Sequence, residues 1–416
     1  MEPIEVINAL NFERLAATAG EKAGIEVISK FVETCGFTPE VESYEINSFN
    51  AGAAAITVGG LNVKAVPFGL CSDVEVSGEL AFVENADRIK VDQGLYNGKI
   101  ILCYGQPRDL NNVMKEGGIK AFIRITPPHR KAYQAGHHQT AFDEGAMPVV
   151  TVTYEDGLAL SKLSGSELSL KIEQTSFKAN AHNIVVDVKG TNPDNNLTTL
   201  VAHFDTVANT PGSSDNAAGC ACLVKILEFF GQNAPRRDLR VIFCGGEELG
   251  LLGSRAYVDA HKEEIEKRVK LNINIDVSGD SLGTDQFTVL GTKEILGYVD
   301  GIARENGLFF KTALDIYSSD CMPFAEQEVP TINIARFGGA PSFYIHTEED
   351  TPKHICNDAL NRSATAGRLI LDRVLNAEIY PVTKAIDESL REKVEKFHYH
   401  NCRTEPKLNW EPKYKK

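Results

Sequence analysis

The sequence predicts an α/β fold, with a mixed central β-sheet flanked by helices and interrupted by a β-rich insert. From about residue 180 onward, apolar runs of strand length alternate with segments of helical periodicity, a pattern typical of α/β domains. Between about 46 and 176 the chain consists instead of short β-like runs separated by Gly, Asn and Asp. A chain of 416 residues is long enough for two or three such domains.

The N-terminal part predicts one helix and one strand of the main domain. Apolar side chains recur at helical spacing over residues 19–36, and Gly36 can end this helix in a left-handed conformation. The next segment, VESYEI, alternates as a half-buried strand does. We therefore assign residues 1–45 to the main domain, which resumes after the insert.

The insert is expected to cover residues 46–176. Its β-like runs are bounded by turn-forming residues, which favours a separate small module. These runs are ELAFVEN, GKIILCYG, GIKAFIRI, MPVVTVTYEDGLAL and ELSLKI.

The main domain is expected to continue over residues 177–380. Its helices are predicted to begin near Asp215, Gly250, Thr292 and Asp320, with a last helix over 358–376. Its predicted strands are HNIVVDVKG, TTLVAHFDT, LRVIFCGG, LNINIDVSG, FTVLG and PTINIARF.

Residues 381–416 form a predicted C-terminal helical extension and tail. One helical stripe of apolar side chains must pack on the body of the protein or on another subunit, so a homo-oligomer is one possible arrangement. The stripe consists of Ile386, Leu390, Val394 and Phe397. We expect the HYHNC segment that follows to be a solvated loop rather than a metal site.

The composition is that of a soluble globular protein, with 43% hydrophobic and 24% charged residues. A formal net charge of -14 argues against nucleic acid or an anionic membrane as partner, because both would meet a repulsive field. The nine cysteines are scattered and mostly lie in apolar runs, which indicates buried reduced thiols. The chain shows no signal-peptide pattern and no apolar segment of membrane-spanning length, so we expect a cytoplasmic protein.

Candidate site residues are concentrated at the ends of predicted strands in the middle third of the chain. His203 and Asp205 close the strand TLVAHFD, and their i, i+2 spacing places both side chains on one face. Asp205 is better placed to orient the His203 ring than to bind a metal itself. Asp215 lies at the tight turn PGSSDNAAG, and Asp276 ends the strand LNINID. An α/β fold gathers such residues at one edge of its sheet.

Glu247 and Glu248 follow the strand VIFCGG, and His346 lies in FYIHTEED. Adjacent side chains point in different directions, so one glutamate can bind a metal while the other faces a water molecule. Taken singly, each of these residues has a structural explanation, such as a helix cap. Together, two imidazoles and several carboxylates without a thiolate indicate a pair of divalent metals in a metal-dependent hydrolase.

Five motifs in this order make the chain resemble the M28 family of co-catalytic metallopeptidases: HFD, SDNAAG, GGEELGLLGS, NIDVSG and IHTEED. The resemblance covers about residues 180–376 and the N-terminal helix and strand, and it implies a zinc-exopeptidase fold. The insert resembles the protease-associated (PA) domain that several members carry. The segment SSDCMPF departs from the family's frequent SDHxPF, because Cys321 stands where a histidine is common, and this puts any role of that histidine in doubt.

The resemblance implies two metal sites that share Asp215 as a bridge. One site consists of His203, Asp215 and Asp276, and the other of Asp215, Glu248 and His346. A cis peptide bond would fall between Asp215 and Asn216. Zinc is the family's default metal, although such a ligand set also accepts cobalt or manganese.

The resemblance also implies roles in the reaction. Glu247 would be the general base and then the proton donor, and Asp205 would orient His203. Tyr317 and Tyr344 lie near the positions from which family members supply an oxyanion donor, but neither aligns cleanly. Either tyrosine can instead pack in the core.

The expected activity is that of an aminopeptidase acting on peptides or aminoacyl-amides, with an acidic rim of Glu247, Asp276 and Glu348 facing the substrate ammonium group. A carboxypeptidase or amidohydrolase of the same fold is the alternative, with Arg336 as a candidate for the terminal carboxylate or as a solvated surface residue. A cyclase acting on N-terminal glutamine typically uses one metal, which the full ligand set disfavours. A non-catalytic receptor or binding protein is a third alternative, although such proteins normally lose ligands.

Overall fold

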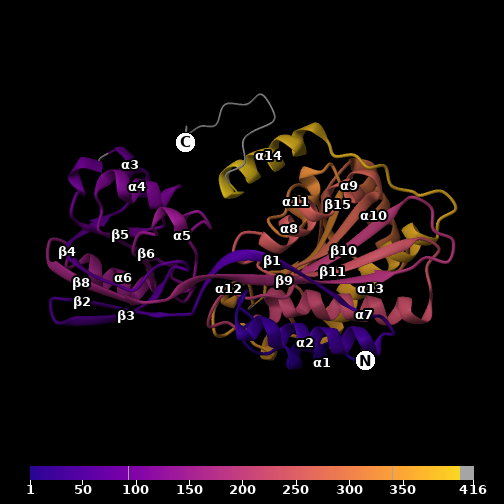
Figure 1. Cartoon of the computed structure of the whole chain (residues 1–416), viewed down its shortest axis with the longest axis horizontal. Helices are drawn as coiled ribbons and strands as arrows, with labels where there is room; N and C mark the ends of the chain where they lie inside the picture. Colours follow the sequence, from indigo (N-terminus) through magenta and orange to yellow (C-terminus); the bar gives the residue numbers. More distant parts are fainter. Residues whose placement is uncertain (92, 340, 403–416) are drawn as a thin grey trace.

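Within residues 1–91, 93–339 and 341–402, which the computed structural model describes, the larger of two lobes is built on an eight-stranded sheet (Figure 1). The central strands β11, β10, β12 and β15 are parallel, whereas β1, β9 and β13 run antiparallel to neighbours. The prediction of an α/β fold with a mixed sheet is therefore confirmed. The strand order is β1(Glu40–Phe49), β9(Ser176–Val188), β11(Asp238–Cys244), β10(Leu197–His203), β12(Val269–Ile275), β15(Thr331–Phe337), β13(Thr284–Leu290) and β14(Lys311–Leu314).

Helices cover both faces of this sheet (Figure 1). The face that packs on the largest hydrophobic core carries α1(Pro3–Ala9), α2(Ala19–Thr34), α7(Ala218–Gln232), α10(Lys293–Glu305) and α13(Asn357–Asn376). The opposite face carries α8(Leu252–Ala260), α9(Lys262–Lys267), α11(Cys321–Glu326) and, farther out, α14(Glu388–Cys402).

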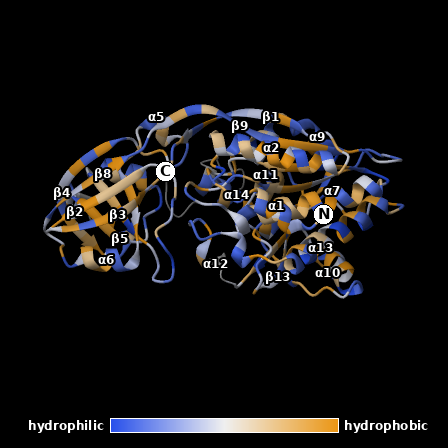
Figure 2. Ribbon diagram, turned by 90° about the horizontal axis from the view of Figure 1, so that it is seen from below, coloured by the Kyte–Doolittle hydropathy of each residue, from blue (hydrophilic) through white to orange (hydrophobic). Residues whose placement is uncertain are grey.

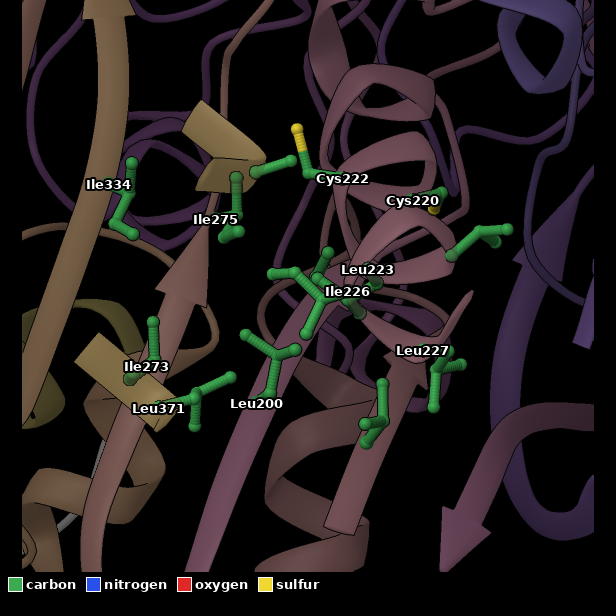
Figure 3. Close-up of a cluster of buried hydrophobic side chains, with 14 of the residues drawn as sticks. Leu200, Cys220, Cys222, Leu223, Ile226, Leu227, Ile273, Ile275, Ile334 and Leu371 are labelled. Atoms are coloured by element: carbon green, nitrogen blue, oxygen red, sulfur yellow. The ribbon is translucent and has the colours of Figure 1, made fainter. Parts of the chain in front are cut away.

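Alternation along the strands supplies the cores of both faces. Leu200 of β10, Ile273 of β12 and Ile334 of β15 point toward α7 and α13, where they meet Ile226 and Leu371 (Figure 3). The next side chains along β10 and β11 pack with α8 and α11 on the other face. Because both faces are covered, nearly all side chains of the central strands are buried, including polar ones such as Asn272 and Asn274. Figure 2 shows hydrophobic residues in both lobes.

The smaller lobe is a closed barrel formed by the insert. It also contains α3(Ala86–Val91), α4(Leu110–Gly117), α5(Ala141–Glu144) and α6(Tyr154–Ser161), and it has a hydrophobic core of its own. Around the barrel the strands are β2(Ala53–Val58), β3(Leu61–Pro67), β7(Val149–Val152), β6(Ala121–Ile125), β5(Ile100–Tyr104), β4(Val74–Val83) and β8(Glu167–Glu173). The resemblance of the insert to PA domains stays a prediction, as do its domain boundaries at residues 46 and 176.

Two details of the barrel differ from the sequence prediction. The segment YEDGLAL, expected to continue a β-like run, forms α6, and the Thr153 hydroxyl accepts a hydrogen bond from the Asp156 N–H at its start. The expected runs also omitted β2 and β3, which form a hairpin around Gly59 and Gly60. Both glycines have positive φ, 55° and 83°, as a two-residue turn of this kind requires.

A ribbon of two long strands connects the lobes (Figure 1). β1 and β9 pair antiparallel from Glu40 opposite Val185 to Phe49 opposite Ser176. The insert leaves and returns at the far end of this ribbon, so it is held at two adjacent points of the larger lobe.

The C-terminal extension packs on the same chain. Leu390 and Val394 of α14, together with Ile386, are buried against a cluster that includes Cys321 and Met322 of α11. The expectation of a solvated loop after this stripe is wrong, because α14 continues to Cys402 and His398 is only 1% exposed.

The cysteine side chains described in the structure, from Cys35 to Cys356, are free thiols, and all but Cys356 are buried. The side chain of Cys402 lies outside the described residues. Among the helices that the structure describes, none combines the length and the apolar composition that a membrane span requires.

Candidate active site

The predicted site residues gather where β10, β11 and β12 end. His203 is the last residue of β10 and pairs with Cys244, the last residue of β11, while Asp276 directly follows β12. Because these strands are parallel, their carboxyl ends share one edge of the sheet. Glu247 and Glu248 follow β11 after two glycines, and a Cβ at the first of these would lie 2.4 Å from the His182 carbonyl oxygen.

Asp215 lies between the two imidazoles. Its Oδ1 atom is 3.1 Å from Nε2 of His203, and its Oδ2 atom is 3.0 Å from Nε2 of His346. Asp276 Oδ1 approaches His203 Nε2 to 3.3 Å, and Glu248 Oε2 approaches His346 Nε2 to 3.2 Å. The structure therefore brings five predicted residues into two groups that share Asp215.

The members of each group converge closely enough to surround a single ion. The candidate ligand atoms of His203, Asp215 and Asp276 all lie within 4.8 Å of one another, and the same holds for Asp215, Glu248 and His346. Imidazole nitrogen with carboxylate oxygen is a donor set suited to divalent ions such as zinc.

The charges of this cluster fit cations. Burial lowers the pKa of His203, but Glu247 and the neighbouring aspartates raise it by more. The resulting pKa lies well above the ordinary value of 6.5. His346 behaves in the same way, with Glu248 and Asp215 as the main opposing groups. Two carboxylate oxygens of this cluster, Oε1 of Glu248 and Oδ1 of Asp276, are buried without a hydrogen-bond partner. Buried carboxylates outnumber the imidazoles here, and such a surplus requires positive charge.

The turn that carries Asp215 is fixed by several groups. The peptide bond between Asp215 and Asn216 is cis, as the resemblance implies. The carboxylate of Asp350 accepts hydrogen bonds from the N–H groups of Ser214 (2.8 Å) and Asp215 (3.1 Å). Burial raises the pKa of Asp350 to about 7, although these N–H groups favour its ionised form.

Arg14 holds the loop that leads to this turn. Its guanidinium group is fully buried and donates hydrogen bonds to carbonyl oxygens on both sides of the loop. The acceptors include Phe204 (2.6 Å), Pro211 (2.6 Å) and Gly212 (3.0 Å), together with Phe12 (2.9 Å) and Leu10 in the N-terminal segment.

Asp205 is placed to orient other site residues rather than to join either group. Its Oδ1 atom lies 3.5 Å from Nδ1 of His203. Its two oxygens accept hydrogen bonds from the backbone N–H groups of Glu247 (3.1 Å) and Glu248 (3.2 Å). A single buried carboxylate thus positions one imidazole and the backbone of both glutamates.

Glu247 faces the cleft beside this cluster. Burial raises the pKa of its carboxyl group well above the ordinary value. His203 opposes this shift, whereas Glu248, Asp276 and Asp320 add to it. The Glu247 side chain lines the same cavity as Asp215 and Asp276, within reach of a molecule bound there.

This cavity has a volume of about 930 Å³ and lies between the two lobes. The insert contributes Arg108 and His137 to its wall, and α14 contributes Phe397 and Asn401. The C-terminal extension therefore forms part of the cleft, which its sequence alone did not indicate.

The two predicted tyrosines are placed differently. The hydroxyl of Tyr317 donates to the carbonyl oxygen of Asp276 (3.2 Å), and its ring lines the cleft. Burial and the carboxylates of Asp276 and Asp215 raise the pKa of Tyr317 well above 10, so it stays protonated. Tyr344 instead stacks on His354, with ring centroids 5.1 Å apart. Only Tyr317 approaches the site.

Two other expectations need correction. Glu348, expected at an acidic rim, is 75% exposed and pairs with Lys131 outside the cleft. Arg336 is neither solvated nor in the cleft, because it is buried and pairs with Asp285 at 2.8 Å. His137 and His138 of the insert are half-buried and line the cleft.

Comparison with known proteins agrees with this geometry. Residues 183–370 match the family described as Peptidase family M28. This segment of the chain resembles M28 peptidases. The matched segment begins in β9 and ends in α13, and it contains all five residues of the two converging groups.

Curated relatives of this chain include an aminopeptidase of Pseudomonas aeruginosa, 24% identical over 310 residues (67% of this chain, 56% of the relative). Another is Aminopeptidase YwaD of Bacillus subtilis, 30% identical over 241 residues (56% of this chain, 51% of the relative). The chain thus spans about half the length of these relatives.

Solved structures with the same fold cover nearly the whole chain. A structure of a Peptidase M28 precursor from Shewanella amazonensis has a TM-score of 0.79 at 19% identity, with 91% of this chain and 95% of that chain covered. A structure titled BSAP, a zinc aminopeptidase from Bacillus subtilis, has a TM-score of 0.76 at 22% identity, with 93% and 98% covered. The insert and the larger lobe therefore occur together in proteins of this fold.

Sequence reasoning missed two residues that shape the site. Asp350 lies four residues after His346, inside the motif IHTEED, and its place there was the available signal. Arg14 lies in the segment between α1 and α2, where nothing in the sequence connects it to a loop almost two hundred residues away.

Proposed function

We propose that this chain is a metal-dependent exopeptidase, specifically an aminopeptidase that removes N-terminal residues from peptides. The observation that carries the proposal is the arrangement of two three-residue ligand groups around a shared Asp215. In this proposal, His203 and Asp276 complete one metal site, and Glu248 and His346 complete the other. Zinc fits the nitrogen and oxygen donors best, although cobalt or manganese are accepted by similar sets.

Bound divalent metals would supply Lewis-acid chemistry at this point, acidifying water and polarising the carbonyl group of the scissile bond. The protein's own task is to hold the ligands in a fixed geometry. Asp350 does this for Asp215 through its hydrogen bonds to the turn. Asp205 lies 3.5 Å from Nδ1 of His203, where it can orient the imidazole ring.

Glu247 is the proposed proton carrier. Its side chain faces the cleft, and its backbone is fixed by Asp205. Burial favours the protonated form of this carboxyl group, so a proton taken from water can be held and then given to the departing amine. The water oxygen forms the new bond to the carbonyl carbon, and the carbon–nitrogen bond breaks as the amine receives the proton.

Tyr317 is the proposed donor to the developing oxyanion. Its hydroxyl group stays protonated at neutral pH and lies beside Asp276 at the floor of the cleft. In the reaction this hydroxyl group would turn from the Asp276 carbonyl oxygen to the oxyanion, and a donor at that position is commonly worth a factor of about 100 or more in turnover.

The choice of an aminopeptidase rests on two kinds of support. The curated relatives from Pseudomonas aeruginosa and Bacillus subtilis are named aminopeptidases. The cleft also carries the carboxylates of Glu247, Asp276 and Asp215, which can attract a substrate ammonium group. The cytoplasmic location expected from the sequence stays a prediction.

A carboxypeptidase or amidohydrolase is the alternative activity. Its sequence-based support was Arg336, and the buried ion pair of Arg336 with Asp285 removes that residue from the cleft. A non-catalytic binding protein is disfavoured, because both groups of candidate metal ligands are complete.

The test is hydrolysis by zinc-loaded protein of two matched leucyl-amide substrates, one with a free amine and one N-acylated. We expect cleavage of the free-amine substrate alone, with loss of turnover but retention of metal in Glu247→Gln. Cleavage of the acylated substrate would instead indicate a carboxypeptidase or amidase. Near wild-type turnover in Glu247→Gln would remove Glu247 from the mechanism.

A further inference from the structure

A second, smaller cavity adjoins the cleft and is lined largely by the insert. Its volume is about 330 Å³. The two cavities are continuous in their lining, because they share Phe49, Gly136, Glu248, Leu249 and His346. A group in the smaller cavity therefore lies directly beside one of the two proposed metal sites.

Two arginines of the insert meet on one tyrosine ring in the wall of this cavity. The guanidinium carbons of Arg124 and Arg130 lie 4.6 Å and 4.3 Å from the ring centroid of Tyr133. Arg124 also lies 4.9 Å from the ring centroid of Phe68. Stacking on aromatic faces holds a guanidinium plane in place while leaving its edge free for an anion.

The cavity offers hydrogen-bond donors that lack acceptors. Nη2 of Arg124, Nε of Arg130 and Nε2 of Gln134 are buried without a hydrogen-bond partner. Gln134 is only 4% exposed. Buried donors without acceptors are uncommon because each costs roughly 1–3 kcal/mol, so their convergence on one cavity indicates an acceptor ligand.

The remaining bonds of these side chains hold them in position. Arg124 Nη1 donates to Gln106 Oε1 (3.3 Å), and Arg130 Nη2 donates to the carbonyl oxygen of Ile345 (2.9 Å). Gln134 Oε1 accepts from the N–H of Ala208 (2.8 Å). The donors are therefore fixed before a ligand arrives, which lowers the cost of binding one.

The charge of the site calls for an anion. Among the ion pairs of the described residues, neither Arg124 nor Arg130 is paired with a carboxylate. Burial lowers the pKa of Arg124, and the positive charge of Arg130 lowers it further. Two half-buried like charges are stabilised when an anion binds between them, and planar guanidinium groups match the two oxygens of a carboxylate.

We propose that Arg124, Arg130 and Gln134 form a subsite that binds a carboxylate of the substrate. This inference rests on the proposed peptidase function and names the substrate class: peptides with a carboxylate close to the scissile bond. The Tyr133 ring, on which both arginines stack, has its centroid 6.0 Å from that of His346. Since an extended chain spans about 3.3–3.6 Å per residue, the carboxylate lies roughly one to three residues from the reacting carbonyl.

Two sources of carboxylate fit this position. One is the free C-terminus of a short peptide, and the other is an acidic side chain near the bond. Leucyl-glycine compared with leucyl-glycinamide tests the first source. Leucyl-glutamyl-amide compared with leucyl-glutaminyl-amide tests the second, because its carboxylate lies on the side chain.

We expect zinc-loaded protein to cleave the carboxylate-bearing member of at least one pair with a kcat/KM about 10- to 100-fold higher, the effect expected from a charge-assisted hydrogen bond. The preference should fall to within about threefold in Arg124→Gln and in Arg130→Gln, and Arg124→Lys should restore part of it. Lys99→Gln is the matched control, because it removes one positive charge from an exposed ion pair with Glu79 on the same barrel. Thermal unfolding of each variant separates misfolding from loss of the subsite.

A binding measurement separates this inference from the proposed function. Calorimetry with zinc-loaded Glu247→Gln protein compares the affinities of leucyl-glycine and leucyl-glycinamide without turnover. Preferential binding of the carboxylate form that disappears in Arg124→Gln supports the subsite even if wild-type protein cleaves neither peptide, a result that would contradict the proposed peptidase. Cleavage of all four peptides without preference would overturn the subsite and leave the peptidase standing. Binding of inorganic phosphate with no preference among the peptides would also overturn it.

Discussion

Asp205 is the residue whose replacement tests the site most directly. Its two carboxylate oxygens accept the backbone N–H groups of Glu247 and Glu248, and Oδ1 lies 3.5 Å from Nδ1 of His203. Asp205→Asn keeps the size of the side chain but turns one acceptor oxygen into a donor NH2 group. One of the two N–H groups then faces a donor and loses its partner, because Asp205 is fully buried and water cannot replace it.

The magnitude follows from these contacts. A hydrogen bond to a charged group contributes about 1.5–3 kcal/mol, and a buried donor left without a partner costs about 1–3 kcal/mol. Because the His203 ring is also less well oriented, the expected loss of transition-state stabilisation is about 3 kcal/mol. This corresponds to roughly a 100-fold fall in kcat/KM. Since the backbone of both glutamates is released, we expect weaker metal binding as well as slower turnover.

The assay is steady-state hydrolysis of a leucyl-amide substrate by zinc-loaded protein, with metal affinity measured by competition with a chelator. Asp187→Asn is the matched control. Asp187 lies in β9 and pairs with Arg240 at the surface of the same sheet, far from the ligand groups. If Asp205→Asn keeps kcat/KM and metal affinity within about threefold of wild type, the proposed positioning role is refuted.

Three further outcomes are expected. Tyr317→Phe should lower kcat about 100-fold through loss of an oxyanion donor, while Tyr344→Phe stays within threefold in the same assay; equal effects would contradict the assignment. Arg14→Met should lower the free energy of unfolding in urea by about 3–5 kcal/mol, because several buried carbonyl groups lose their donor; a loss under 1 kcal/mol would show that water replaces it. Burial lowers the pKa of His137 to about 4, below its ordinary value of 6.5. The unfolded chain therefore binds the proton more readily, so this contribution to stability is present above pH 6.5 and is lost as the pH falls toward 4. His137→Gln keeps a donor for the Met147 carbonyl oxygen. It should reduce the fall in the free energy of unfolding between about pH 6.5 and pH 4 by about 2 kcal/mol. Identical profiles of unfolding free energy against pH for the variant and the wild type would disprove this.

The strands of the larger lobe could be predicted because of their burial. β10, β11, β12 and β15 are covered on both faces, so each is rich in buried apolar side chains and has a distinct end, although polar residues such as Asn272 and Asn274 interrupt the pattern. The short strand β14, half of whose residues are exposed, carries no such signal, and it was not predicted. The helix α6 was missed because YEDGLAL follows an apolar run directly, although Thr153 and Asp156 are a recognisable N-terminal signal.

The site residues could be predicted in part because the central strands are parallel. A polar residue at the end of such a strand must lie at one edge of the sheet, whatever the loops do. This places His203 and Asp276 together, and the motif order adds Asp215, Glu248 and His346. Sequence position gave no comparable constraint on Tyr317 and Tyr344, and the structure separates them.

By itself, the sequence determined the α/β fold, the presence of an insert and the residues that converge around Asp215, because these follow from periodicity and from motifs at strand ends. Only the tertiary structure decided what surrounds them. The insert brings Arg124 and Arg130 beside the cleft, α14 closes one side of it, and Arg14 supports the loop before Asp215. These contacts join segments far apart in the chain, and they depend on how the two lobes and the C-terminal helix pack, which no local pattern encodes.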